Sequence, residues 1–252
     1  MEIARIDLSE VTINEWNLIV NKIHNQANEL ERKCLIYMDI IGPEFITGNI
    51  EITTSGAKRK RFIRLKKGEH IITTADGKLV KDNKKDHKGI QLETLIVPVS
   101  QLSIIQDSNI GDCVLFDNGK IECRVLKKSK DKLELIVISY STKGLKLKSN
   151  KSIYLPDTEI NEKPITKSDL ANLPFIMKRA VIVGYSYLKN TEDVKTLYQE
   201  LDKFDRKDLG VILKIRNTES FENLPMILLE AMRKSRLGIM IDRGDLSTEV
   251  GA

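Results

Sequence analysis

The sequence has few of the residues that mark several protein classes. Its 252 residues include three cysteines, six prolines and three histidines. The cysteines, Cys34, Cys113 and Cys123, form no C-x-x-C pair, which argues against a disulfide framework and a zinc ribbon. The histidines are too scattered to give metal-ligand spacing. We therefore expect three reduced thiols and no zinc centre.

The sequence also lacks a long apolar run. Stretches such as 238–241 fall far short of the roughly 18 residues that a membrane span needs. The first ten residues carry charges where a signal peptide needs apolar side chains. We expect a soluble, cytoplasmic protein with no membrane partner.

The residues that are present suit a globular fold with an uneven charge distribution. The chain is 41% hydrophobic and 31% charged, which excludes a disordered chain. The net charge is +5, yet residues 44–156 alone hold 22 Lys and Arg against 13 Asp and Glu. This asymmetry indicates two units with different roles.

The parts on either side of residues 44–156 alternate between strand and helix patterns. Helix starts are indicated by the capping signals Thr12-x-x-Glu15 and Thr166-x-x-Asp169, and by Asn190. Strands separated by helices predict parallel βα units. The expected strands cover 2–8, 34–41, 180–187, 210–215 and 237–241, and the expected helices include 190–204 and a single helix over 220–234.

The middle of the chain shows a different pattern. Short β-branched or alternating runs cover 90–97, 113–116, 121–126 and 132–139, and turn signals such as Asp76-Gly77 and Asp117-Asn118-Gly119 separate the runs. No helical stripe is visible there. The pattern predicts an all-β domain inserted between the βα units.

Polar residues follow the ends of the expected parallel strands. In βα architectures these ends converge, together with the helix N-termini that follow them. Five strand ends that carry Arg, Asp, Ser and Lys predict a polar mouth that handles anions. The segments are ARIDLS at 4–9, DIIGPE at 39–44, YSYLK at 185–189, KIRN at 214–217 and DRGDL at 242–246.

These and other segments resemble motifs of the pyruvate kinase family. ARIDLS is similar to that family's A-R-x-N-x-S, DIIGPEFITG at 39–48 to D-[TL]-[KR]-G-P-E-I-R-T-G, and GIMIDRGDLSTE at 238–249 to G-I-M-V-A-R-G-D-L-G-V-E. FDNGKI at 116–121, STKGLKL at 141–147 and KIRN resemble its D-D-G-x-I, S-K-K-G-V-N-L and K-I-E-N. The motifs keep the family's order over nearly the whole chain.

The resemblance implies an α/β fold, a partial TIM-type (β/α) barrel interrupted by an inserted all-β barrel that acts as a lid. The first barrel segment is expected over 1–43, the lid over 44–156 and the second barrel segment over 157–252. The family's last barrel strands and its C-terminal regulatory domain are absent from the sequence.

The resemblance further implies phosphoryl transfer from phosphoenolpyruvate to ADP, a glycolytic reaction that gives pyruvate and ATP and uses Mg²⁺ and K⁺. Such chemistry depends on positioning and on cations around the phosphoryl group. By position, Arg5 and Lys214 are the expected catalytic residues. Gly244, Asp245 and Ser186 are the expected substrate-binding residues, Asp245 the Mg²⁺ ligand, and Asp7, Ser9 and Asp39 the K⁺ ligands.

Four positions depart from the family pattern: Arg216, Ile41, Ile46 and Glu10. Arg216 stands where the family has the second Mg²⁺-binding glutamate, and this reversal of charge argues against Mg²⁺ binding. Ile41 and Ile46 replace basic residues, and Glu10 stands in the segment that carries the family's histidine. The replaced residue at 46 normally helps to bind nucleotide phosphate, so its loss weakens the expectation for ADP.

Several alternatives stay open on sequence alone. The chain is either a fragment of a longer pyruvate-kinase-like protein, which its abrupt end favours, or a degenerate paralogue whose open barrel closes on a partner. It is either an active phosphotransferase or a pseudoenzyme that binds a phosphorylated metabolite or an active homologue. A homo-oligomer is a further possibility.

A basic run over 58–67, KRKRFIRLKK, raises the question of a nucleic-acid partner. We favour a solvated basic β-hairpin with Phe62, Ile63 and Leu65 inward, because only one aromatic residue is available for base stacking. Nucleic acid is therefore not an expected partner.

Overall fold

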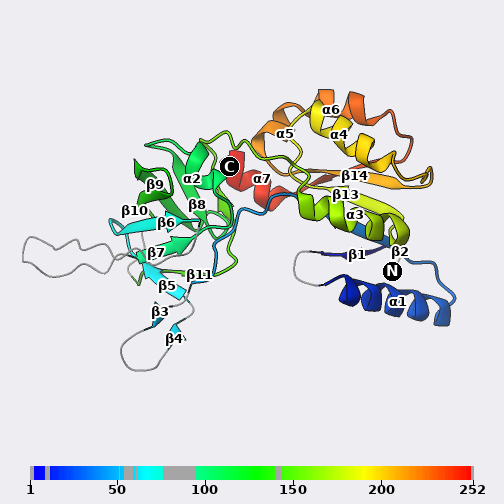
Figure 1. Cartoon of the computed structure of the whole chain (residues 1–252), viewed down its shortest axis with the longest axis horizontal. Helices are drawn as coiled ribbons and strands as arrows, with labels where there is room; N and C mark the ends of the chain where they lie inside the picture. The colour runs from blue at the N-terminus through cyan, green and yellow to red at the C-terminus, as the bar shows by residue number, and fades with distance from the viewer. Residues whose placement is uncertain are drawn as a thin grey trace, which may run out of the picture. The chain divides into compact units, whose positions relative to one another are not determined.

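The computed structural model describes residues 3–8, 12–50, 52–53, 59–60, 62–75, 95–139 and 143–250. The chain forms two compact units (Figure 1). The first combines Met1–Pro43 with Lys163–Val250, and the second comprises Glu44–Glu162. Ser9, Glu10 and the Asp76-Gly77 turn lie outside the described residues.

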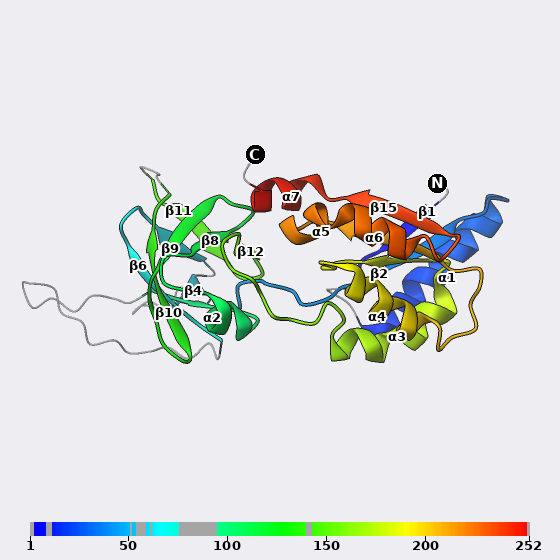
Figure 2. The same ribbon diagram turned by 90° about the horizontal axis from the view of Figure 1, so that it is seen from above.

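The first unit is built on a parallel sheet of five strands in the order β1-β2-β13-β14-β15. Figure 2 shows β1, β2 and β15 together with helices of the same unit. The sheet is curled, so the expected mixed α/β fold with a partial barrel is confirmed. Its order follows the chain, and Gly184 on β13 lies opposite Asp39 on β2. The strands are β1 (Ile3–Ile6), β2 (Leu35–Ile40), β13 (Ile182–Tyr185), β14 (Gly210–Ile215) and β15 (Leu237–Ile241).

Six helices of the first unit connect or follow these strands within the described residues (Figure 1). The capping boxes expected at Thr12 and Thr166 are both present, and Asn190 caps its helix through the backbone N–H groups of Glu192 and Asp193. The helices are α1 (Ile13–Glu29), α3 (Lys167–Arg179), α4 (Thr191–Leu201), α5 (Thr218–Glu222), α6 (Leu224–Ala231) and α7 (Arg243–Val250).

The single helix predicted over 220–234 is wrong. Two helices, α5 and α6, meet at Asn223, which is the C-cap of the first and the N-cap of the second. Pro225 lies in the first turn of α6, where its missing N–H costs nothing. A continuous helix would bring the Pro225 ring against the carbonyl group of Phe221, so the chain breaks there.

The core of the first unit lies between the sheet and its helices. Trp16 and Val20 of α1, Leu173 and Ile176 of α3 and Leu197 of α4 are all buried against strand residues. The ring of Trp16 lies 5.7 Å from that of Phe175, centroid to centroid. This packing fixes the strands that carry the candidate site. No helix among the described residues is long and apolar enough to span a bilayer.

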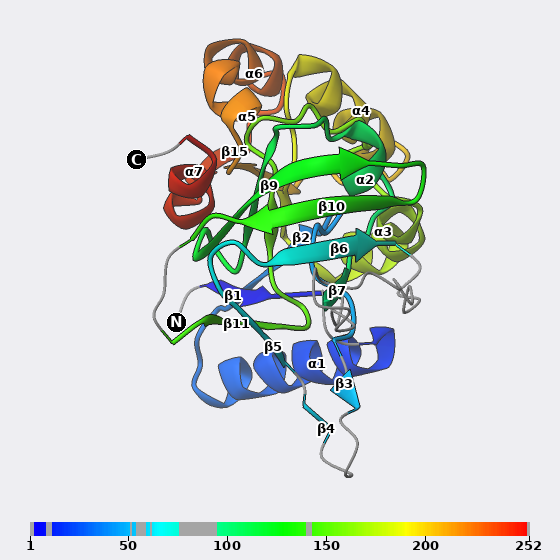
Figure 3. The ribbon, with the colours of Figure 1, turned by 90° about the vertical axis from the view of Figure 1, so that its left-hand side faces the viewer.

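The second unit is mostly β-structure (Figure 3). A sheet of six strands has the order β12-β8-β9-β10-β6-β7, and two pairs, β11-β5 and β3-β4, complete the described strands. The strands are β3 (Ile52–Thr53), β4 (Arg59–Lys60), β5 (Phe62–Leu65), β6 (His70–Thr74), β7 (Leu95–Pro98), β8 (Cys113–Phe116), β9 (Ile121–Lys128), β10 (Lys132–Val137), β11 (Leu145–Lys148) and β12 (Ile153–Tyr154).

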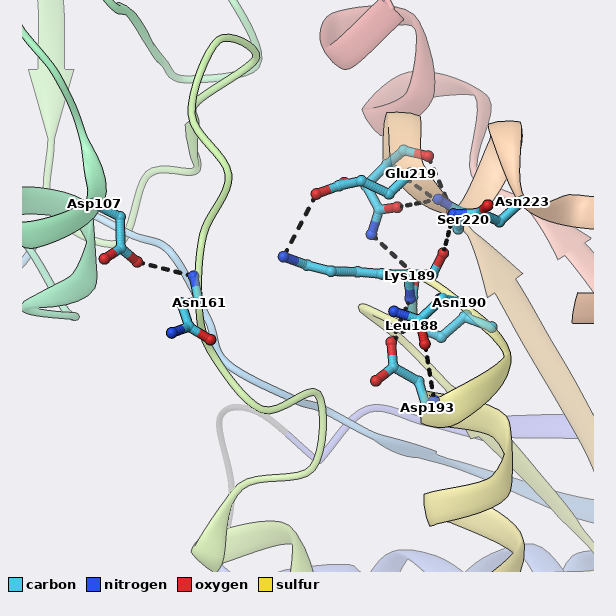
Figure 4. Close-up of polar contacts among 10 residues, drawn as sticks. Asp107, Asn161, Leu188, Lys189, Asn190, Asp193, Glu219, Ser220 and Asn223 are labelled. Atoms are coloured by element: carbon cyan, nitrogen blue, oxygen red, sulfur yellow. Dashed lines mark hydrogen bonds and ion pairs between the residues drawn. The ribbon is translucent and has the colours of Figure 1, made fainter.

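Two expectations about this segment are corrected. It is not entirely β, because α2 (Ser103–Asp107) is helical and buries Ile104 and Ile105. Asp107 also accepts a hydrogen bond of 2.9 Å from the backbone N–H of Asn161 (Figure 4). The basic run is no single hairpin, because β4 pairs with β3 whereas β5 pairs with β11.

The inward positions predicted for β5 are confirmed for Ile63 and Leu65 but not for Phe62, which neighbours Ile63 and therefore faces the other side of the strand. Ile63 and Leu65 are buried, whereas Phe62 is only half-buried and has the Nζ atom of Lys146 5.0 Å from its ring centroid. Lys58 and Arg61 lie outside the described residues.

Candidate functional site

Three charged side chains meet on the sheet of the first unit. Asp39 of β2 is 4% exposed, and its Oδ2 atom accepts a hydrogen bond of 2.8 Å from Nε of Arg5 on β1. The Arg5 Nη2 atom lies 2.6 Å from the same oxygen. Lys214, on β14, places its Nζ atom 3.7 Å from it. Side chains from three strands thus converge on a single carboxylate oxygen.

The two cations of this cluster differ in exposure and therefore in their electrostatics. The Lys214 side chain is 6% exposed, and burial lowers its pKa despite the nearby charge of Asp39, with Arg216 and Arg5 lowering it further. The Arg5 side chain is 45% exposed. Burial lowers the pKa of Arg5, but the charge and hydrogen bond of Asp39 outweigh this and raise it. Arg5 therefore presents a permanent charge to solvent, while burial disfavours the charge of Lys214.

Gly184 gives Asp39 the space it occupies. A Cβ atom on Gly184 would lie 2.0 Å from Oδ1 of Asp39 and 2.3 Å from the hydroxyl oxygen of Tyr37. Both of these oxygens are buried without a hydrogen-bond partner among the described residues. Burial raises the pKa of Tyr37, and the neighbouring carboxylate of Asp39 adds to the effect. The Arg5 guanidinium carbon lies 5.8 Å from the centre of the Tyr37 ring.

A second charged pair follows β14. Nη2 of Arg216 donates a hydrogen bond to Oδ2 of Asp245 in the first turn of α7. The guanidinium carbon also lies 4.5 Å from the centre of the Tyr187 ring. Burial lowers the pKa of Arg216, but Tyr187, Asp245 and Asp242 together raise it above its ordinary value. Arg216 is therefore a fixed positive charge.

An acidic residue of α7 lies in the electrostatic field of this pair. Burial, and then the charges of Glu219 and Asp245, raise the pKa of Glu249 to about 7, whereas Arg216 and Lys189 act in the opposite direction. At neutral pH Glu249 is thus divided between its neutral and charged forms.

The loops after β13 and β14 are tied together by polar contacts (Figure 4). The side-chain amide of Asn217 donates to the carbonyl oxygen of Leu188 at 3.2 Å, and that of Asn223 donates to the carbonyl oxygen of Lys189 at 3.1 Å. Lys189 extends toward Glu219, with 3.5 Å between Nζ and Oε1. These contacts hold the two loops next to one another at the carboxyl ends of their strands.

The remaining candidate residues are distributed as follows. Ser186 is 2% exposed directly after β13, and Gly244 lies in the first turn of α7, where its carbonyl oxygen accepts from Thr248 Oγ1 at 3.0 Å. Asp7 is exposed after β1. Ile46 belongs to the second unit and pairs with Ser152.

The segment after β2 is held by a residue to which the sequence analysis gave only a capping role. The Asp169 carboxylate accepts hydrogen bonds from the backbone N–H groups of Ile41 at 3.1 Å and Gly42 at 3.2 Å. It also accepts from the Thr166 hydroxyl at 2.6 Å. The capping signal at 166–169 showed the helix start, but nothing in the sequence showed the contact with residues 41–42.

Two tyrosines of the site were not predicted. Tyr37 lies on the same side of β2 as Asp39, since alternate strand residues face one way. An aromatic residue two positions before an acid in an otherwise aliphatic strand could have indicated it. Tyr187 has a φ of 57°, in the left-handed region that most non-glycine residues avoid, and no sequence signal indicates that conformation.

Comparison with known proteins identifies the family. The family model described as pyruvate kinase, barrel domain, matches residues 1–252. The chain belongs to the pyruvate kinase family. Relatives named pyruvate kinase include those of Bacillus licheniformis and Geobacillus stearothermophilus, both 27% identical over 253 residues. These alignments cover 100% of this chain, but 39% and 38% of the respective relatives. A pyruvate kinase of Thermococcus litoralis is 27% identical over 99% of this chain and 46% of its own length. The chain thus spans about two-fifths of the length of these relatives.

The Mg²⁺ that the pyruvate kinase family implies does not fit the residues around Asp245. The Asp245 carboxylate is already paired with the Arg216 guanidinium. A unit charge about 4 Å from a divalent ion repels it by about 8 kcal/mol at an effective dielectric constant near 20. The described residues also contain no group of three or more His, Cys, Asp or Glu side chains that could hold a metal ion.

One atom suits a monovalent cation at the position where the family resemblance predicts K⁺. The Oδ1 atom of Asp39 is buried without a hydrogen-bond partner among the described residues. Oxygen ligands of this kind suit hard cations. Asp7 is described but exposed, and Ser9 lies outside the described residues. The K⁺ site therefore remains a prediction that rests on Asp39.

Proposed function

We propose that the candidate site binds phosphoenolpyruvate and serves phosphoryl transfer to ADP, giving pyruvate and ATP. The observation that supports this most is the convergence of Arg5 and Lys214 on Asp39, from strands far apart in the chain. Two cations held next to each other can bind a phosphoryl group, and both stand at positions matching family motifs.

Each side chain has a role that follows from its charge and exposure. Arg5, which is partly exposed, contacts the phosphoryl oxygens with Nη1, the one guanidinium nitrogen that does not contact Asp39. Burial disfavours the charge of Lys214, so an arriving dianion favours its protonated form. Its ammonium group then stabilises the enolate oxygen that remains when the P–O bond breaks. Ser186 and Gly244 line the substrate-binding site. K⁺ at Asp39 would supply further positive charge.

We assign the role of a lid over the nucleotide to residues 44–156, on the strength of the family's layout. Ile41 and Ile46 leave fewer cations for the ADP phosphates than the family motif provides. We therefore expect weaker ADP binding than phosphoenolpyruvate binding.

Pyruvate formation tests the proposal. A coupled assay with phosphoenolpyruvate, ADP, Mg²⁺ and K⁺ is expected to show turnover in the full chain and none in Lys214→Met. Arg233→Glu is the matched control, because Arg233 is an exposed cation paired with Glu230 on α6. Turnover that survives Lys214→Met would contradict the assignment.

A second function is favoured by a specific observation, the Arg216–Asp245 pair. If that pair excludes Mg²⁺ and the Arg216 charge does not replace the metal in phosphoryl transfer, the site binds a phosphorylated metabolite without turning it over, and the chain acts as a pseudoenzyme. Such a protein could signal to an active homologue or to a second copy of itself. Calorimetric binding of phosphoenolpyruvate together with absent turnover would select this function over the first.

A further inference from the structure

Arg216 is held in one place by its neighbours. The Nη2 atom of Arg216 donates a hydrogen bond to Asp245, and its guanidinium group lies over the ring of Tyr187. The Arg216 side chain is only 20% exposed. Tyr187 is itself tightly packed, because a Cβ atom on Gly42 would lie 2.8 Å from its Cδ2 atom. The guanidinium group is therefore ordered before any ligand arrives.

Arg216 also lies near Lys214 in the chain. It follows Ile215, the last residue of β14, and Lys214 is the last residue of the strand but one. The charge of Arg216 is close enough to Lys214 to lower its pKa. Lys214 in turn is joined to Arg5 through Asp39.

The position of Arg216 conflicts with a bound divalent metal. Asp245 is the carboxylate that the family motif assigns to Mg²⁺, and here a guanidinium group occupies one of its oxygens. Asp242 is a second carboxylate near Asp245, and its charge also raises the pKa of Arg216. A divalent cation at either carboxylate would have to approach a fixed positive charge.

We infer that Arg216 takes the place of the divalent cation, so that this site binds a phosphorylated carboxylic acid without any divalent metal. The inference rests on the proposed binding of phosphoenolpyruvate. Arg5 and Lys214 hold the phosphoryl group, and the remaining N–H donors of Arg216 hold the carboxylate. A guanidinium group suits this task because its planar donors match a carboxylate in a two-bond arrangement.

The first test compares phosphoenolpyruvate binding with and without metal. The full chain is titrated by calorimetry in EDTA and again in 10 mM Mg²⁺, a concentration on the order of ten times a weak site's Kd. We expect the two dissociation constants to agree within about twofold. Binding that requires Mg²⁺, or that tightens more than about tenfold with it, overturns the inference while leaving the proposed function intact.

The second test measures the metal alone and is independent of phosphoenolpyruvate. Mn²⁺, followed by electron paramagnetic resonance, is titrated into the native chain, Arg216→Glu and the matched surface control Arg233→Glu. We expect Arg216→Glu to bind Mn²⁺ at least about tenfold more tightly than the other two proteins. Arg216→Met removes the charge without adding a carboxylate, and its affinity should lie between them.

Equal Mn²⁺ affinity in the native chain and in Arg216→Glu overturns the inference. If Arg216→Glu does not fold, tight Mn²⁺ binding by the native chain has the same consequence. Absence of phosphoenolpyruvate binding in both buffers refutes the proposed function. In that case the Mn²⁺ titration still decides whether Arg216 excludes a divalent ion.

Discussion

Gly184→Ala tests whether the positions of Asp39 and its two cations depend on the absence of a side chain at residue 184. The new methyl group would lie 2.0 Å from Oδ1 of Asp39, and 2.3 Å and 2.6 Å from the hydroxyl oxygen and Cε2 of Tyr37. All three distances are far below an ordinary contact, so Asp39 or Tyr37 has to move. Asp39 cannot move freely, because Arg5 and Lys214 both contact its other oxygen.

The expected cost follows from the crowding. Overpacking a core typically destabilises a protein by about 1–3 kcal/mol. Because the new Cβ atom would overlap with three atoms, we expect Gly184→Ala to cost about 3 kcal/mol, the upper end of this range. Gly210→Ala is the matched control in the neighbouring strand, because its nearest contacts would be 3.5 Å and 3.6 Å. We expect Gly210→Ala to change the free energy of unfolding by less than about 1 kcal/mol, in the stabilising direction.

Urea unfolding of both variants measures these changes in stability. A phosphoenolpyruvate titration shows whether the substitution also weakens ligand binding. We expect Gly184→Ala to weaken phosphoenolpyruvate binding at least about tenfold, equivalent to about 1.4 kcal/mol. The reasoning is refuted if Gly184→Ala matches Gly210→Ala in both stability and affinity. In that case the packing around Asp39 does not position the cations.

Three further predictions concern stability and its pH dependence. Burial disfavours the charge on Lys214, and Asp39 keeps its hydrogen bond to Arg5 when Lys214 is removed. Lys214→Met should therefore stabilise the chain by about 1 kcal/mol in urea unfolding, and a loss of stability would contradict this. Asp169→Asn replaces one of two carboxylate oxygens that accept backbone and hydroxyl hydrogen bonds, and it should lower the free energy of unfolding by about 2–3 kcal/mol. An unchanged urea midpoint would contradict this prediction. Since the pKa of Glu249 is raised to about 7, the folded state holds this proton more tightly than the unfolded chain does. Stability should therefore fall by about 2 kcal/mol between pH 5 and 8, and Glu249→Gln should flatten that slope; equal slopes would contradict the assignment.

Much of the first unit's fold could be predicted because its signals are local. The capping boxes at Thr12 and Thr166 mark helix starts within a few residues of sequence, and the strands at 210–215 and 237–241 have the predicted bounds. The break at Asn223 was missed although Pro225 signals it, because the apolar pattern continues across it. The short helix α2 was missed because five residues are too few to show a helical stripe of apolar side chains.

The site could be predicted only in part. The ends of parallel strands indicated a polar mouth in the segments that contain Arg5, Asp39 and Lys214, and the family resemblance singled out these three residues. Which side chains would pair there was not predictable. The bond from Arg216 to Asp245 joins residues 29 positions apart and depends on how α7 follows β15. Arg216 was recognised as a departure from the family motif, but its contacts required the structure.

The measurement that tests the account most directly is a calorimetric titration of phosphoenolpyruvate into the native chain and into Lys214→Met. The account predicts binding by the native chain and at least about tenfold weaker binding by the variant, with Arg233→Glu unchanged. Equal affinity in all three proteins, or no binding by the folded native chain, would contradict the assignment of this site.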